Sequence, residues 1–203
     1  MGGGLRQLVA EKDWSATPLG PKEGWSEALR TTVETCLGSR FPVIIFWGPE
    51  LVQVYNDAYA PIIGAKHPQA LGQTAAACFP EVWDVIGPML HGVLESGEAT
   101  WSDDLLLMLE RNGFAEECYF TFSYSPAGGA PVEGVFCAVI ETTRRVVGER
   151  RFDALRELST ALTGAHHVAE VLDAAATTLG RHPPDLPAGL LVRETTAGAR
   201  DER

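Results

Sequence analysis

The chain has 203 residues, with 16 Lys and Arg against 27 Asp and Glu, a net charge of −11, and 45% hydrophobic residues. This length accommodates one well-cored domain with flanking helices or part of a second domain. The negative charge argues against a nucleic-acid-binding surface. No apolar run approaches the roughly 20 residues that span a bilayer. Because the N-terminus also lacks the apolar core of a secretory signal, we expect a cytoplasmic protein.

Residues 1–40 are expected to form an N-terminal extension. Residues 1–12 are glycine-rich and then charged, which predicts a loose end. Residues 13–25 hold two tryptophans among several Pro and Gly, which predicts an ordered irregular segment pinned by its aromatic side chains. Ser26 is a favourable N-cap for an amphipathic helix over residues 26–37.

Residues 41–64, FPVIIFWGPELVQVYNDAYAPIIG, predict two strands, a turn between them and a short helix. The first run is rich in β-branched and aromatic residues, as expected for a buried strand. Gly48 and Pro49 mark a hairpin turn. Asn56 or Asp57 can cap the short helix, which Gly64 is placed to end.

Two helices and three strands are predicted next. The helices cover residues 75–79 and 81–95, and Pro88 is expected to kink or split the second. The strands cover residues 99–109, 117–125 and 132–140, and alternation in the middle one places one set of side chains on a single face. The order β-β-α-α-β-β-β predicts an α+β fold, a five-stranded antiparallel sheet with helices on one face. The set on one face of the middle strand is Cys118, Phe120, Phe122 and Tyr124.

From residue 143 the pattern changes to that of amphipathic helices. A helix over residues 143–164 is expected to pair with its twin in a dimer through apolar positions with heptad-like spacing. A second helix is predicted at residues 168–179, a linker at 183–187 and a strand at 189–193. The tail, residues 165–203, is therefore interpreted as the truncated start of another domain. The dimerisation residues are Phe152, Leu155, Leu158 and Leu162.

The segments "YNDAY", "LERNG", "YFTFSYSP" and "GVFCAVIETTRRVVGERR" resemble the N-terminal PAS sensory domain of multidomain bacterial sensor histidine kinases. The resemblance runs from residue 13 to about residue 165. It implies a PAS core at residues 41–142, a signalling helix at 143–164 and the start of a GAF domain at 165–203. It also implies a catalytic output domain, most simply a histidine kinase of a two-component system, beyond this chain.

The resemblance implies a non-catalytic sensor and homodimerisation module that passes a small-molecule or redox signal to its output domain. The last strand of PAS domains often ends in Asp-x-Thr, a motif that couples the core to the output helix. Here Glu141, Thr142 and Thr143 occupy that position and are the expected signal relay. The alternative is a ligand-free PAS adaptor that mediates protein–protein interaction. An enzyme is the weakest hypothesis, because no nucleophile–base pair, phosphate loop or metal-ligand spacing can be assembled from the sequence.

Aromatic and amide side chains in the predicted core are candidates for a ligand pocket. The same aromatic residues could simply fill the core, and Asn56 could act only as an N-cap. Both interpretations stay open for each of them. The candidates are Tyr55, Asn56, Tyr59, Trp83, Trp101, Phe120, Phe122 and Tyr124.

No cofactor can be assigned from the sequence, and its features argue against both haem and flavin. His67 and His91 could ligate haem but are better interpreted as surface histidines. Cys78 lacks the Asn-Cys-Arg-Phe-Leu-Gln motif of flavin-binding light sensors. Cys118 and Cys137 are expected on neighbouring strands, where they would be either buried reduced thiols or a redox switch.

Overall fold

The computed structural model describes residues 4–165 and 167–181. They divide into two compact units, one ending at Arg144 and the other beginning at Arg145. The predicted linker at 183–187 and strand at 189–193 lie outside the described residues. No helix in the described ranges is long and apolar enough to cross a membrane.

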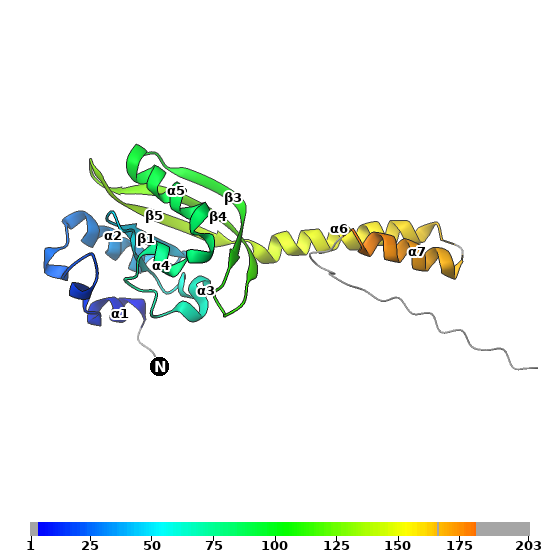
Figure 1. The fold of residues 1–203 in the computed structure, drawn as a ribbon, viewed down its shortest axis with the longest axis horizontal. Helices are drawn as coiled ribbons and strands as arrows, with labels where there is room; N and C mark the ends of the chain where they lie inside the picture. Colours follow the sequence, from blue (N-terminus) through cyan, green and yellow to red (C-terminus); the bar gives the residue numbers. More distant parts are fainter. Residues whose placement is uncertain (1–3, 166, 182–203) are drawn as a thin grey trace, which may run out of the picture. The chain divides into compact units, whose positions relative to one another are not determined.

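The first unit contains one sheet and its covering helices (Figure 1). Its strands are β1 (Val43–Trp47), β2 (Val52–Tyr55), β3 (Thr100–Leu109), β4 (Glu116–Gly128) and β5 (Val132–Glu141). Its α-helices are α1 (Leu5–Glu11), α2 (Glu27–Gly38), α3 (Ala60–Ile63), α4 (Ala75–Cys78) and α5 (Trp83–Ser96). Short 3-10 helices are η1 (Trp14–Ala16), η2 (Lys22–Gly24), η3 (Gly64–Lys66) and η4 (Pro80–Val82).

The strands form one antiparallel sheet in the order β2-β1-β5-β4-β3. This arrangement confirms the predicted α+β fold with a five-stranded antiparallel sheet. The alternation expected along β4 is also present, since Cys118, Phe120, Phe122 and Tyr124 are buried and the residues between them are only half-buried.

The sheet is covered on both faces where β1 lies. Helix α5 contacts β4 and β5, and side chains of α5 and of β1 line the same cavity on one face. The residues of β1 that alternate with this set, Val43, Ile45 and Trp47, point the other way and are equally buried. Helix α2 contacts β1, β2 and β4, so the N-terminal extension covers this second face.

The N-terminal extension is more ordered than predicted. Residues 5–11 form α1, with Leu5 and Val9 buried, so the expected loose end is wrong. The Asp57 carboxylate accepts a hydrogen bond from the Leu5 backbone N–H at 2.7 Å, which holds the start of the helix. Trp14 and Trp25 pack edge to face with ring centroids 5.0 Å apart. This contact agrees with the prediction that aromatic side chains hold the segment 13–25 in place.

Helix α5 runs through Pro88 as one helix, so of the expected kink or split the split is wrong. Gly97 ends it in the left-handed region, at a φ of 70°, which glycine adopts without strain. The predicted cap of α2 is confirmed, because the Ser26 hydroxyl accepts a hydrogen bond from the Leu29 N–H at 3.1 Å.

The second unit contains most of α6 (Thr143–Thr163) and all of α7 (Val168–Leu179). No described residue of α6 is buried, and Phe152 and Leu155 are 66% and 65% exposed. A helix of this length gains most of its stability from packing an apolar face. The exposed pair therefore marks a face of α6 that is open in the single chain.

Candidate functional site: a small apolar cavity and the junction after the last strand

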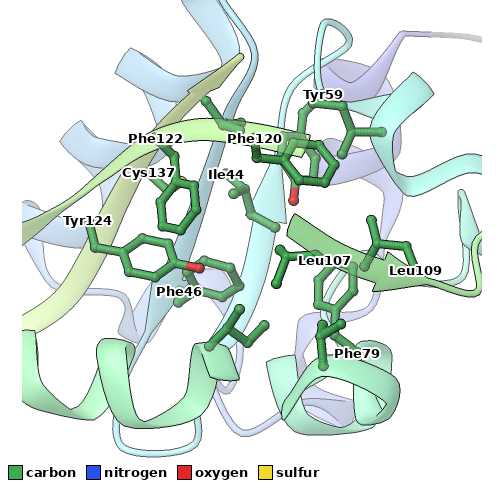
Figure 2. Close-up of a pocket in the computed structure, with 14 residues that line it drawn as sticks. Ile44, Phe46, Tyr59, Phe79, Leu107, Leu109, Phe120, Phe122, Tyr124 and Cys137 are labelled. Atoms are coloured by element: carbon green, nitrogen blue, oxygen red, sulfur yellow. The ribbon is translucent and has the colours of Figure 1, made fainter. Parts of the chain in front are cut away.

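A small cavity lies between the sheet and the helices α3 and α5 (Figure 2). Its volume is about 40 Å³. Side chains from four strands and from the helical side line it: Ile44, Phe46, Tyr59, Ile62, Phe79, Val82, Ile86, Leu107, Leu109, Phe120, Phe122, Tyr124, Cys137 and Val139.

The cavity is far smaller than a typical ligand pocket. Sites for drug-sized molecules occupy roughly 300–1,000 Å³. A cavity needs roughly 10–15 Å³ to admit a water molecule, so the space of about 40 Å³ is large enough for water. A larger occupant would require the side chains of the core to move apart.

Two tyrosine hydroxyls point into this cavity. Figure 2 shows the hydroxyl oxygens of Tyr59 and Tyr124 among the apolar side chains. The two residues are only 7% and 5% exposed, and within the described part of the chain neither hydroxyl has a hydrogen-bond partner. Burial raises the pKa of Tyr59 and of Tyr124 well above the usual value, so both stay protonated at neutral pH.

Replacing Tyr59 or Tyr124 by phenylalanine is expected to leave the free energy of unfolding unchanged within about 0.5 kcal/mol, because neither hydroxyl has a hydrogen bond to another described residue that the change would remove. Tyr55→Phe is the matched control. It removes the 2.9 Å hydrogen bond between Tyr55 and His67 and should cost about 1 kcal/mol. Urea unfolding checks this, and an equal loss in all three variants would contradict it.

The cavity brings together four of the eight candidate pocket residues, Tyr59, Phe120, Phe122 and Tyr124. The other four lie outside its lining. The Tyr55 hydroxyl forms a hydrogen bond with His67. Trp83 packs edge to face on His91 with ring centroids 6.0 Å apart.

Trp101 lies on the other face of the sheet. It is 69% exposed and is paired with Ser123 of β4, whose neighbours Phe122 and Tyr124 face the cavity. Side chains of successive strand residues point to opposite faces. Trp101 therefore points away from the cavity and cannot line it.

Asn56 joins several backbone segments instead of lining the cavity. It is 1% exposed, and its Oδ1 accepts from the backbone N–H groups of Val43 and Tyr59 at 3.2 and 3.0 Å. Its Nδ2 donates to three backbone carbonyls at 2.8–3.1 Å. The bond to Tyr59 closes the turn before α3 and is one of five hydrogen bonds. The N-cap of α3 is Tyr59 and the helix has no side-chain cap, so the predicted cap by Asn56 or Asp57 is wrong. The three carbonyls belong to Cys36, Ser39 and Phe41.

A charged cluster holds the junction where β5 ends and α6 begins. Arg111, in the β3–β4 turn, donates from both terminal nitrogens to the two carboxylate oxygens of Glu141 at 2.8 and 2.9 Å. Arg111 also meets Glu116 at 3.3 Å. The Thr143 hydroxyl donates to Glu141 at 3.0 Å and accepts from the Tyr119 N–H at 3.0 Å. The hydrogen bonds from Arg111 lower the pKa of Glu141, which therefore stays ionised.

The same junction is tied to the edge strand β3. The Thr142 hydroxyl donates to the Asp104 carboxylate at 2.6 Å. Asp104 lies in a register shift between Ser102 and Leu105 and has a φ of 46°, a left-handed conformation that is uncommon outside glycine. The Thr142 hydroxyl thus contacts β3, whereas the Thr142 N–H and the Thr143 hydroxyl both bond to the backbone of Tyr119 in β4.

Arg111 also connects this junction to the helical side of the cavity. Its carbonyl accepts a hydrogen bond from the Ala65 N–H at 2.8 Å, directly after α3. Gly64 has a φ of 63°, and a Cβ there would lie 2.9 Å from the Arg111 carbonyl oxygen. Glycine is therefore required for this close approach. Ile62, two residues earlier, lines the cavity.

The sequence reasoning missed Arg111, although a signal was present. Arg111 is the only Lys or Arg between Lys66 and Arg144, in a stretch rich in Asp and Glu. Arg and a carboxylate form strong paired hydrogen bonds, so the single Arg in this stretch is a natural partner for the carboxylate of Glu141. Its position between the strands predicted at residues 99–109 and 117–125 indicates a loop, where charged side chains are usually exposed, whereas the Arg111 side chain is only 14% exposed.

Of the two alternatives for Cys118 and Cys137, buried thiols or a redox switch, the strand register contradicts the switch. Cys137 of β5 lies opposite Tyr124 of β4, and Cys118 of β4 lies opposite Leu107 of β3. Cys118 and Tyr124 are six residues apart along β4, which corresponds to about 20 Å. The two thiols therefore cannot form the proposed redox pair.

All four cysteines are free and buried. Burial raises the pKa of Cys36 to about 12 and that of Cys118 to about 11. The thiolate is the reactive form, so these environments disfavour redox chemistry. The described residues contain no cluster of three or more His, Cys, Asp and Glu placed to hold a metal ion.

No protein-family model matches the sequence, and no curated protein matches it. Among solved structures, the chain is similar to the Rhodobacter sphaeroides LOV protein, with 15% identity over 75% of this chain and 91% of that chain and a TM-score of 0.48. It is also similar to a sensory box sensor histidine kinase from Vibrio cholerae, with 16% identity over 56% of this chain and 86% of that chain and a TM-score of 0.37. A third similar structure is the PAS domain of Bordetella pertussis BvgS, with 20% identity over 64% of this chain and 97% of that chain and a TM-score of 0.40.

Proposed function

We propose that this chain is a non-catalytic sensory module in which the cavity, the Arg111–Glu141 junction and α6 act in series. A change in packing around the cavity would move α3 and the turn that carries Arg111. Arg111 would pass the movement to Glu141 and Thr143, at the first residues of α6. The observation that carries this proposal is the pair of contacts made by Arg111, one to Ala65 and one to Glu141.

We also propose that the output is a histidine kinase of a bacterial two-component system, joined through α6 and a GAF-like domain. The support is the resemblance in sequence over residues 13 to about 165. Helix α6 would pair with its twin in a homodimer and carry the signal, which requires two arrangements that the sensor biases differently.

A ligand-free adaptor is the second candidate function, and the small size of the cavity favours it. A space of about 40 Å³ is what remains in a core that is nearly filled by its own side chains. An adaptor of this kind would bind other subunits without any change that starts in the cavity.

A cavity-filling substitution separates the two functions without any knowledge of the ligand. Ile86→Phe adds a ring in the cavity, whereas Val85→Phe adds the same ring on an exposed position of α5. The sensor predicts that Ile86→Phe alone changes amide hydrogen exchange at residues 141–147. Equal exchange in both variants, with both folded by circular dichroism, would favour the adaptor.

Replacing Phe152 and Leu155 by aspartate is expected to weaken the proposed dimer by at least about 100-fold, because two charges would be buried in an apolar helix interface. The matched control is Ser159→Asp with Thr160→Asp, which adds the same charge to exposed polar positions of α6. Light scattering over a concentration series measures the result. An unchanged mass in the first variant would exclude pairing through this face.

A further inference from the structure

The cavity carries chemical information beyond its size. Tyr59 and Tyr124 are the two lining residues with a polar group that can make a strong hydrogen bond, and both hydroxyls are aimed inward (Figure 2). Within the described residues neither hydroxyl has a partner, although both side chains are more than nine-tenths buried. Each hydroxyl therefore keeps a free hydrogen-bonding position at the cavity, which an occupant of the cavity can fill.

The lining excludes charged occupants. No Lys, Arg, His, Asp or Glu contributes to it. An ion that entered would lose its hydration without gaining a counter-charge. The free energy of this desolvation is far larger than the stabilisation from two neutral hydrogen bonds. The occupant is therefore uncharged, and most of its surface must be apolar to match the surrounding side chains.

The protonation of the two tyrosines sets the polarity of the contact. Burial raises the pKa of both groups, so each keeps its proton and can donate it. A carbonyl, ether or hydroxyl oxygen is the natural acceptor for such donors. The volume of about 40 Å³ limits the occupant to a few heavy atoms unless the core expands.

We propose that the cavity binds a small uncharged organic molecule whose oxygen accepts hydrogen bonds from Tyr59 and Tyr124. This inference rests on the proposed sensory function and names the chemical class of the signal. Ordered water is the competing occupant, since it offers acceptors of the right size.

Acetone and isobutene form a matched pair of probes, because they share a shape and differ in the acceptor oxygen. Methyl resonances of Ile44 and Val139, which line the cavity, report binding by NMR titration of the whole chain. We expect acetone to shift them saturably. Tyr59→Phe and Tyr124→Phe should each weaken acetone about tenfold, the usual scale for a lost hydrogen bond to a ligand, and should change the Kd of isobutene by less than about twofold.

Tyr119→Phe is the control, because it removes a tyrosine hydroxyl from a half-buried position on β4 that does not line the cavity. It should leave the Kd of both probes unchanged. Equal weakening of acetone and isobutene in the cavity variants would overturn the role of the hydroxyls. The absence of saturable acetone shifts would overturn the proposal.

The test is independent of the test of the sensory function. The comparison of Ile86→Phe with Val85→Phe reports on α6 without any ligand. If acetone fails to bind but Ile86→Phe alters exchange at residues 141–147, the ligand class is wrong and the relay stands. If acetone binds through the tyrosines and exchange is unaltered, the site exists but does not signal through α6.

Discussion

Replacing Asn56 by alanine is expected to lower the free energy of unfolding by about 4 kcal/mol, one of the largest effects of any single change in this chain. The substitution removes five hydrogen bonds and leaves three carbonyls and two N–H groups without their side-chain partner in or near the core. These groups belong to the end of α2, the start of β1 and the start of α3. The N-terminal extension and the cavity should therefore loosen together.

Asn56→Asp sharpens this prediction. It keeps the acceptor for the Val43 and Tyr59 N–H groups but points a carboxylate oxygen at three carbonyls, so it should be as damaging as alanine at neutral pH. Asn112→Ala is the matched control, since Asn112 is exposed and its side chain donates one hydrogen bond, to Glu116. Guanidinium unfolding measures all three. If Asn56→Ala lowered the free energy of unfolding no more than Asn112→Ala does, Asn56 would stabilise only its own turn.

Replacing Arg111 by methionine is expected to lower the free energy of unfolding by about 2 kcal/mol and to uncouple α6 from the cavity. The change leaves the carboxylate of Glu141 without its bidentate partner. The side chains of Arg111 and Glu141 are 14% and 28% exposed. Breaking a fully buried pair costs about 3–5 kcal/mol, and the partial exposure here reduces that figure.

Two further variants test whether the loss arises from the pair. In Arg111→Met with Glu141→Leu, the unpaired charge is gone, so part of the lost stability should return. Arg145→Met removes the exposed pair with Glu149 and should change stability by less than about 0.5 kcal/mol. A double variant as unstable as the sum of its two single changes would show that Arg111 and Glu141 do not interact energetically.

The pair also predicts a dependence on pH. Hydrogen bonds from Arg111 lower the pKa of Glu141 below its ordinary value of 4.5, so the unfolded chain takes up this proton first as the pH falls. The stability that this group contributes is complete above 4.5 and is lost as the pH falls through the lower value of the folded protein. The unfolding free energy of Arg111→Met should therefore fall less than that of the unaltered protein between about pH 6 and about pH 3.

Sequence patterns were sufficient for the sheet but not for the direction of every side chain. In β4 the period of two is unbroken, so Phe120, Phe122 and Tyr124 could be assigned to one face. In β3 the same rule would place Trp101 with the leucines at positions 105 and 107. The extra residue at the register shift reverses the faces, so Trp101 points outward while these leucines point inward.

The remaining errors arise from contacts that spacing along the chain does not encode. Cys118 and Cys137 lie on adjacent strands as expected, but the register of a 13-residue strand decides which residues meet. Asn56 could be recognised as a residue of the turn before α3, because its bond to Tyr59 is local. Its three carbonyl partners lie 15 to 20 residues away and are brought to it only by the packing of α2 against the sheet.

The register shift in β3 also affects how the protein behaves at high concentration. An edge strand with a regular row of free backbone groups invites another chain to add a strand and so to aggregate. At β3 the shift and two consecutive aspartates, Asp103 and Asp104, interrupt that row. At the opposite edge, Gln53 of β2 already pairs through its backbone with Gly72 and Gln73 at 2.9 Å. Neither edge of the sheet therefore presents an unbroken row of free backbone groups along its whole length.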